Sequence, residues 1–335
     1  MRISYRKRLL LRKILKLLGI VLAVAAVVVI GVLIYFERFV TYERGGSAAL
    51  HAPERTIPAS EETTHVPATA GSITLEIEQK PETEQTIGEM GGYYITTTML
   101  RQPEKLLALL REMEQPCAVM IEVKSVFGNY YYSSSVSGAQ TADVDIEAID
   151  AMIDYLHRRG FYMIAVVPAF RDRTFALDNQ SCGLPLSGGA LWMDDLGCYW
   201  LDPANETVQS HLMQVARELY DLGFSEIAFS EFRFPDTDSI VYSADRAQAL
   251  TDAAQALDDF FAGSKLTLSY VTDRDDFPAA ACSGRLYISN VDGSKVERYA
   301  QLYGSAEKLK ELVFLANSRD TRFEARTVLR PLLTE

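Results

Sequence analysis

Residues 206–235 read ETVQSHLMQVARELYDLGFSEIAFSEFRFP, and this stretch indicates the fold class. Apolar side chains recur every three or four positions over residues 206–222, which predicts an amphipathic helix. Gly223 then supplies a residue suited to the left-handed end of a helix. The β-rich run at 226–232 follows almost at once and predicts a strand. A helix that leads directly into such a strand is the repeating unit of a parallel α/β sheet.

The same alternation runs from Gly91 to the end of the chain. Further amphipathic runs predict helices at residues 103–113, 146–159, 246–262 and 306–312. Strands are predicted at residues 93–98, 118–124, 162–169, 226–232, 265–272, 285–290 and 311–317.

Seven strands within roughly 245 residues favour a closed barrel over an open sheet, because a full (β/α)8 barrel has eight strands in about 250 residues. The eighth strand is expected near Ile73 or at 327–329, unless it is absent. No GxGxxG or GxxxxGK[ST] motif follows any strand, so the usual mark of a nucleotide-binding sheet is missing. We therefore expect an α/β fold of the (β/α)8 TIM-barrel type, complete or short of one strand.

The segment from Leu17 to Phe36 reads LLGIVLAVAAVVVIGVLIYF, which has no charge and is long enough to cross a bilayer. Seven basic residues and no acidic one precede it, which predicts a cytoplasmic N-terminus and an extracytoplasmic remainder. A secretory signal cleaved near Gly46 is the alternative, although its apolar core would normally be shorter. The expected organisation is a basic tail at 1–16, a transmembrane helix at 17–36, a disordered stalk at 37–88 and a barrel at 89–335.

The composition of the chain argues against some classes of binding partner. The chain carries a formal net charge of −12 although its N-terminal segment is basic, so the outer domain is strongly acidic. Nucleic acid is a poor partner for such a domain, because phosphates are held by Lys and Arg. No Cys or His spacing marks a metal site, and no cofactor is expected. Cys182 and Cys198 flank one loop and could form a disulfide outside the cytoplasm or remain free.

Barrel enzymes work at the C-terminal ends of their strands, so candidate residues were sought there. Glu122 and Lys124 share one face at the end of the second strand and either line a pocket or form a buried ion pair. Asp172 lies between Arg171 and Arg173 just after the third strand, and two neighbouring guanidiniums favour its ionised form.

The long loop after the third strand holds Trp192, Trp200 and Asp202. The two tryptophans could overhang the site and stack on sugar rings, or pack the loop onto the barrel. Asp202 could line the site or fix the turn at Pro203.

The fourth strand ends at Ser230, Glu231 and Arg233, and the fifth at Asp273. Glu231 and Arg233 could act on a ligand or pair with each other. Asp273 is the first acidic residue after its strand and could act on a ligand or belong to a solvated loop.

Four blocks of this sequence resemble a known family. They are Gly92-Tyr93-Tyr94, MIEVK at 120–124, Phe170-Arg171-Asp172, and the run from Trp200 to Pro235 that includes WLDP and FSEIAFSEFRFP. In order and spacing they are similar to the putative glycoside hydrolase domain, a TIM-barrel family distantly related to α-amylase-type enzymes. The resemblance covers roughly residues 91–240.

The chain also departs from the family pattern, which reads FDEIQFDYIRFP at the fourth strand. The family's second Asp, its expected nucleophile-like carboxylate, falls on Ser230, and its Tyr falls on Glu231. Glycosidases usually need two carboxylates that flank the scissile bond. The resemblance therefore implies catalysis by carboxylates chosen from Glu231, Asp273, Glu122 and Asp172, with substrate bound by Lys124, Trp192, Trp200, Asp202, Ser230 and Arg233.

Three functions fit these observations. The first is a membrane-anchored glycoside hydrolase that acts on cell-envelope polysaccharide. The second is a degenerate barrel that binds cell-wall glycan without cutting it, with Trp192, Trp200 and Tyr130–Tyr132 stacking on sugar rings. The third is a tethered scaffold that docks another envelope protein.

Overall fold

The structure, a computed structural model, describes residues 40–42, 48–50, 86–279, 283–306, 308–317 and 320–333. The chain divides into two compact units, Met1–Glu78 and Gln79–Glu335. In the first unit, β1 (Val40–Tyr42) pairs antiparallel with β2 (Ala48–Leu50). In the part of the chain that is described, no helix has the length and apolar character needed to span a membrane. The transmembrane helix predicted from Leu17 to Phe36 and most of the predicted stalk at 37–88 lie outside the described residues.

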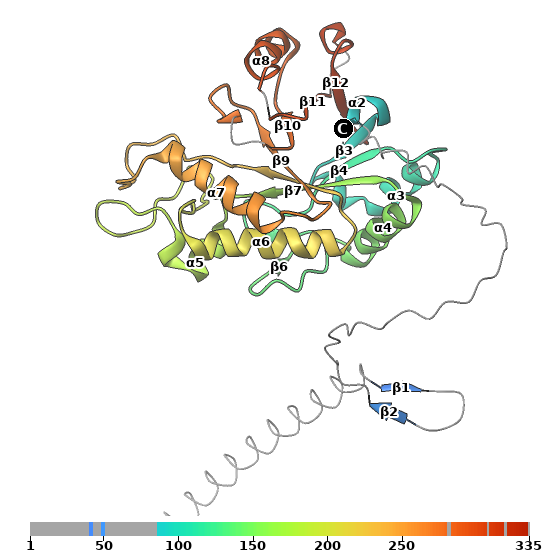
Figure 1. The fold of residues 1–335 in the computed structure, drawn as a ribbon, viewed down its shortest axis with the longest axis horizontal. Coiled ribbons are helices and arrows are strands. Elements are labelled where there is room, and N and C mark those ends of the chain that lie inside the picture. The colour runs from blue at the N-terminus through green and yellow to red at the C-terminus, as the bar shows by residue number, and fades with distance from the viewer. Residues whose placement is uncertain are drawn as a thin grey trace, which may run out of the picture. The chain divides into compact units, whose positions relative to one another are not determined.

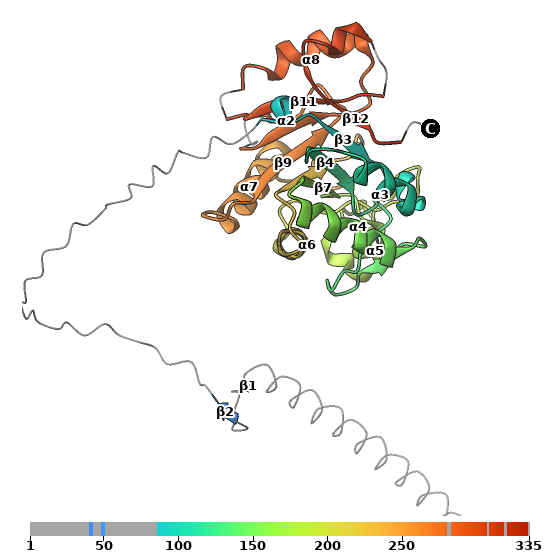
Figure 2. The same ribbon diagram turned by 90° about the vertical axis from the view of Figure 1, so that its right-hand side faces the viewer.

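The second unit is built on a closed barrel of eight parallel strands. Figures 1 and 2 show these strands together with the helices that pack around them. The eighth strand is β12, one of the two positions expected from the sequence, and it closes the ring by pairing with β3. The other position expected for the eighth strand, near Ile73, lies outside the described residues. The strands are β3 (Gly92–Ile95), β4 (Ala118–Glu122), β7 (Tyr162–Pro168), β8 (Glu226–Ser230), β9 (Thr267–Thr272), β10 (Arg285–Ile288), β11 (Glu311–Leu315) and β12 (Thr327–Pro331).

Amphipathic helices cover the outside of the barrel, with their apolar faces in one large core cluster. Helix α4 ends at Gly160, which adopts the left-handed conformation that suits glycine at this position. The helix expected at 306–312 is wrong, because the last helix ends at Tyr303 and β11 already begins at Glu311. The helices are α2 (Ile87–Met90), α3 (Pro103–Arg111), α4 (Ile146–Arg159), α5 (Arg173–Asp178), α6 (Glu206–Asp221), α7 (Arg246–Phe260) and α8 (Val296–Tyr303).

The remaining regular elements are short. A two-stranded sheet pairs β5 (Asn129–Tyr130) with β6 (Gln140–Thr141) in the segment between β4 and α4. The 3-10 helices are η1 (Met99–Arg101), η2 (Gln180–Cys182), η4 (Gly293–Lys295) and η5 (Thr321–Phe323). Cys182 in η2 and Cys198 in the following loop are both free. The Cys182 thiol donates to Oδ1 of Asn205 at 3.7 Å, so the disulfide considered from the sequence is not formed.

The inside of the barrel is a separate apolar cluster. Side chains that alternate along the strands meet there, and Ile87 of α2 belongs to the same cluster. The strand residues in this cluster are Ala118, Met120, Ile164, Val166, Ala228, Tyr287, Val313 and Leu329. The interior is therefore a filled core, as in other barrels of this type.

A buried ionic network lies at the N-terminal ends of the strands. Arg285, the first residue of β10, contacts Glu226 at 2.7 Å and Glu311 at 3.2 Å. The Glu226 carboxylate also accepts hydrogen bonds from the hydroxyls of Tyr287 and Tyr162 at 2.8 and 2.9 Å. Glu226 is fully buried, so these partners replace the water that it loses on folding.

Replacing Arg285 by Met would leave the Glu226 carboxylate buried without its cation. We expect the free energy of unfolding to fall by about 3–5 kcal/mol, measured by urea denaturation with tryptophan fluorescence. The control is Arg158→Met, which removes an exposed ion pair to Asp154 within α4 and should cost less than about 1 kcal/mol. Equal losses in the two variants would mean that the interior pair contributes no more than a surface pair.

Candidate functional site

The C-terminal ends of the barrel strands surround a cavity of ≈ 1190 Å³. Met120, Val166 and Val271 lie on the interior face of their strands and form part of its apolar floor. Polar side chains from the strand ends and the following loops form its wall, which is where barrels of this type bind ligands. Among the residues that the sequence singled out, those lining the cavity are Glu122, Lys124, Tyr131, Ser230, Glu231, Arg233 and Asp273.

Glu122 is the last residue of β4, and strand alternation turns it inward above Met120. One of its carboxylate oxygens accepts a hydrogen bond from the backbone N–H of Thr97 at 2.8 Å. Burial raises the pKa of Glu122 above its ordinary value, and hydrogen bonding with Thr97 offsets only part of that rise. Glu122 can therefore keep a proton to a higher pH than an exposed glutamate, which suits a proton donor.

Lys124 and Asp172 form a buried ion pair at the edge of the cavity. Lys124 lines the cavity, but Asp172 does not. The Asp172 carboxylate also accepts a hydrogen bond from the backbone N–H of Phe175 at 2.9 Å, which caps α5. The expectation that Arg171 and Arg173 hold Asp172 is wrong, because Lys124 is its salt-bridge partner. Asp172 thus holds Lys124 in place and caps α5, but does not itself line the cavity.

Ser230 and Glu231 both line the cavity although they are consecutive. Strand alternation alone would point them in opposite directions. The strand ends at Ser230, however, and Glu231 has a φ of 50°, in the left-handed region that glutamate rarely adopts. Among the described residues, the other non-glycine residue with positive φ is Asn290, which follows β10 and lines the same cavity. Such strain gathers at functional sites.

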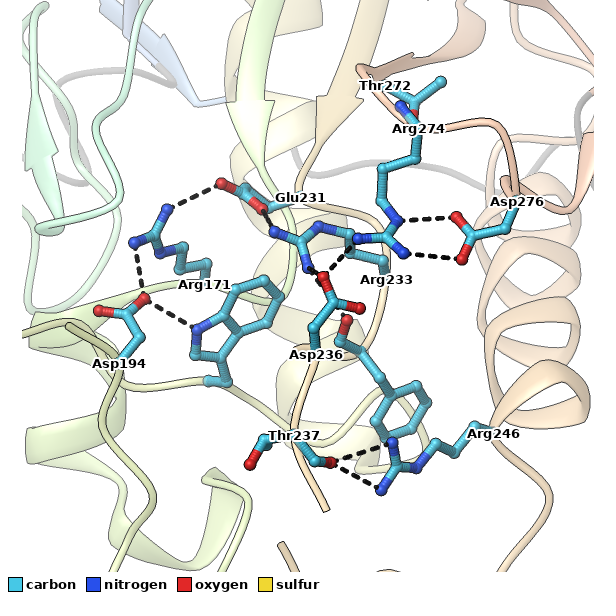
Figure 3. Close-up of polar contacts among 12 residues, drawn as sticks. Arg171, Asp194, Glu231, Arg233, Asp236, Thr237, Arg246, Thr272, Arg274 and Asp276 are labelled. Atoms are coloured by element: carbon cyan, nitrogen blue, oxygen red, sulfur yellow. Dashed lines mark hydrogen bonds and ion pairs between the residues drawn. The ribbon is translucent and has the colours of Figure 1, made fainter. Parts of the chain in front are cut away.

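Two arginines hold the Glu231 carboxylate, as Figure 3 shows. Arg171 contacts one carboxylate oxygen at 3.0 Å, and Arg233 contacts the other at 3.1 Å. The pairing of Glu231 with Arg233 considered from the sequence is therefore formed. Both oxygens of Glu231 are engaged, which favours a positioning or ligand-orienting role over proton exchange.

Trp200 packs behind these arginines. Its ring centroid lies 5.6 Å from the Arg171 guanidinium carbon and 4.6 Å from that of Arg233. The indole N–H donates to Asp194 at 3.0 Å, and Arg171 contacts the same carboxylate at 2.6 Å (Figure 3). Burial alone would raise the pKa of Asp194, but hydrogen bonds from Cys198, Trp200 and Arg171 together lower it. Trp200 is buried and does not line the cavity, so it supports the arginines.

Asp273 follows β9 on the interior face that it shares with Val271, and it is exposed to the cavity. Among the described residues, no ion pair or hydrogen bond engages its carboxylate. The adjacent Arg274 is instead held by Asp236 and Asp276 across the rim (Figure 3). The hydrogen bond from Arg274 lowers the pKa of Asp276. Asp273 is thus a carboxylate free to meet a ligand.

Other predicted contacts do not reach the cavity. Trp192 packs against Trp200, with ring centroids 6.5 Å apart. Asp202 accepts a hydrogen bond from the backbone N–H of Ala204 at 2.9 Å, so it fixes a turn. Tyr130 and Tyr132 are buried, which rules out the sugar stacking expected of them. The residues of the segment after β4 that do line the cavity include Phe127 and Tyr131.

The sequence reading missed several cavity residues, among them Phe127, Asn290 and the acidic loops around Asp292 and Asp320. Phe127 stands in the aromatic run FGNYYYSSS, and an exposed aromatic in a loop after a strand could have marked it. Asn290 is the last residue of the strand predicted at 285–290, and asparagine is the residue that best tolerates positive φ after glycine. No local signal identifies Asp292 and Asp320, because only barrel closure brings their loops to the rim.

Residues 92–274 match the profile of a family described as "Putative glycosyl hydrolase domain". No curated protein matches the chain.

Among solved structures, a hypothetical protein from Ruminiclostridium thermocellum has a TM-score of 0.46 and 21% identity, over 53% of this chain and 97% of that one. A GH20 exo-β-N-acetylglucosaminidase from Vibrio harveyi has a TM-score of 0.48 and 10% identity, over 64% of this chain and 38% of that one. The glycoside hydrolase domain of PelA from Pseudomonas aeruginosa has a TM-score of 0.40 and 16% identity, over 69% and 85%. The chain thus spans well under half of the Vibrio protein.

Substituting Trp200 by Leu would remove the ring on which the two arginines pack and leave Asp194 without its indole donor. We expect the free energy of unfolding to fall by about 2–4 kcal/mol, measured by urea denaturation with circular dichroism. Trp192→Leu is the control, because Trp192 is only half-buried and should cost clearly less. A larger loss for Trp192 would overturn the supporting role given to Trp200.

Proposed function

Because the chain belongs to the family described as "Putative glycosyl hydrolase domain", we propose that its barrel mouth hydrolyses glycosidic bonds in a polysaccharide. The observation that carries this proposal is a pair of carboxylates in unlike surroundings within one cavity. Glu122 is half-buried and its pKa is raised, whereas Asp273 is exposed and its carboxylate is unpaired among the described residues. Two carboxyl groups in different environments are what acid and base catalysis of this reaction needs.

Glu122 is the proposed proton donor. Its raised pKa lets it remain protonated until it gives its proton to the leaving glycosidic oxygen. Asp273 is the proposed second carboxylate, which acts on the anomeric carbon or on the attacking water. It comes from β9, while Glu122 comes from β4, so a sugar bound over Ser230 between them can meet both.

Glu231 and the arginines hold the substrate in this scheme. The carboxylate of Glu231 is immobilised by Arg171 and Arg233, which leaves a rigid acceptor for sugar hydroxyls. Phe127 and Tyr131 line the same cavity and offer ring faces to the C–H surface of a sugar. These groups replace the tryptophan platform considered from the sequence.

Glu122→Gln and Asp273→Asn should each lower kcat/KM by about 10²–10⁴-fold. The assay is release of reducing ends from a panel of neutral, N-acetylated and deacetylated polysaccharides. Activity of the unmodified protein should fall as pH rises through the raised pKa of Glu122. This decline on the alkaline side of the pH–activity profile should be absent in Glu122→Gln.

Asp275→Asn is the matched control, since Asp275 is a close neighbour that pairs with Arg298 and does not line the cavity. It should retain full activity. Unchanged hydrolysis by both Glu122→Gln and Asp273→Asn would refute the assignment of these two carboxylates.

One observation favours a second function. Ser230 occupies the interior position at the end of β8 and lines the cavity, where the sequence pattern of the family led us to expect an Asp. A barrel that lacks this carboxylate could bind glycan without cutting it. If the unmodified protein binds oligosaccharides but releases no reducing ends, and Ser230→Asp gains hydrolysis, the binding function is the correct one.

We further propose that Leu17 to Phe36 anchors the protein in the cell membrane, with the N-terminus cytoplasmic and the barrel extracytoplasmic. The support is the uncharged length of that segment and its basic flank. The substrate is then a cell-envelope polysaccharide.

The anchor has a direct test in intact cells. Protease added from outside should degrade the barrel, and removal of residues 17–36 should move the protein from the carbonate-resistant membrane pellet to the supernatant. A barrel that resists protease until the cells are lysed would contradict the proposed orientation.

A further inference from the structure

A second cavity of ≈ 250 Å³ lies on the far side of the Lys124–Asp172 pair from the main cavity. Its walls come from the segment between β4 and α4, from the α5 region, and from α6. Asp172 lines this cavity, whereas Lys124 lines the main one. The buried ion pair is therefore a shared wall, with one partner facing each cavity.

Two buried polar groups in this second cavity lack a partner. The hydroxyl of Tyr130 and the Nε2 atom of His211 make no hydrogen bond to any residue that the structure describes. Their residues are only 2% and 8% exposed. An unsatisfied buried polar atom is costly and calls for an explanation, and here two of them line one hollow.

Three other polar side chains of the wall are already engaged, whereas the carboxylate of Asp178 and the hydroxyl of Ser137 are exposed to solvent. The Asp172 carboxylate is bound by Lys124 and by the backbone of Phe175. The Thr174 hydroxyl donates to the carbonyl of Phe127 at 2.8 Å, and the Asn179 amide donates to that of Phe175 at 3.1 Å. Among the buried side chains of the wall, the unmet hydrogen-bonding capacity is thus on Tyr130 and His211.

The charge of the cavity floor favours a neutral occupant. The negative charge of Asp172 is compensated by Lys124, so an added ion would find no counter-charge at the bottom. Burial raises the pKa of Tyr130, which keeps its hydroxyl a donor. Burial and then the charge of Lys124 lower the pKa of His211 to about 4, so its imidazole is neutral near pH 7.

The size of the cavity argues for more than one trapped water. Its volume corresponds to roughly eight waters at liquid density. The ring of Phe175 stacks on His211, with centroids 4.1 Å apart, and gives the wall an apolar surface beside its polar groups. Ser137 and Gly138 at the rim are exposed, so the cavity is reached from solvent.

We propose that this cavity is a binding site for a neutral polyhydroxylated molecule of monosaccharide size, held by the Tyr130 hydroxyl and the His211 imidazole. An occupant would also touch the back of the Lys124–Asp172 pair, which links this site to the main cavity. The proposal does not depend on the hydrolytic function, because it concerns a different cavity and a binding event.

The test is NMR of the full chain with ¹⁵N-labelled histidine. The chain has four histidines, and the His211 signal is identified by its loss in His211→Gln. The probes are D-glucose, N-acetyl-D-glucosamine and glycerol. We expect at least one of them to shift the Nε2 resonance of His211 saturably at neutral pH.

Tyr130→Phe should weaken that binding about fivefold or more, because it removes one hydrogen-bond partner and little volume. Tyr131→Phe is the matched control: the same change one residue away, on the main cavity, should leave the binding constant unaltered. Ser137→Trp, which obstructs the rim without touching the core, should abolish binding.

Two outcomes would overturn the proposal. One is equal binding by Tyr130→Phe and Tyr131→Phe, which would place the ligand elsewhere. The other is a His211 resonance that no probe moves, which would mean that the cavity holds water only. Hydrolysis is not measured in this experiment, so neither outcome bears on the activity of the main cavity.

Discussion

The ion pair between Arg285 and Glu226 is the constraint on which the rest of the barrel depends. Both residues open their strands and point into the barrel, where two tyrosine hydroxyls and Glu311 complete the network. Because side chains alternate, this pairing fixes which residues of β8 and β10 face inward all the way to the rim. A shift of the register by one residue would turn Glu231 inward in place of Ser230, and it would turn the ionic network at the N-terminal ends of the strands outward.

Sequence pattern predicted the barrel well, because each strand is a short β-rich run between helices with clear ends. The place of β12 was one of two positions that the sequence offered for an eighth strand, and strand alternation placed Glu122 and Lys124 on one face, which is the inward one. The family, too, was identified from four short blocks around the strand ends, and the profile match over residues 92–274 confirms it. What these features share is that they depend on local sequence.

The errors have a common cause, which is that partners from distant loops decide the environment of a side chain. Asp172 has arginines on both sides in the sequence, yet Lys124 from another strand neutralises it. For Trp200 the sequence left open a platform for sugars or packing of the loop, and it could not identify Asp194 and the two guanidiniums that surround the ring. Glu231 reaches the cavity only because its backbone leaves the strand geometry. No period or composition rule carries that information.

The backbone at Glu231 and Asn290 has a consequence for how this protein can change. Glycine would relax both positions at once, since it adopts positive φ without a steric penalty. A laboratory selection for thermal stability would therefore favour glycine at Glu231 and at Asn290. Each such substitution would remove a side chain that lines the cavity, so a gain in thermal stability at either position would come with a loss of function.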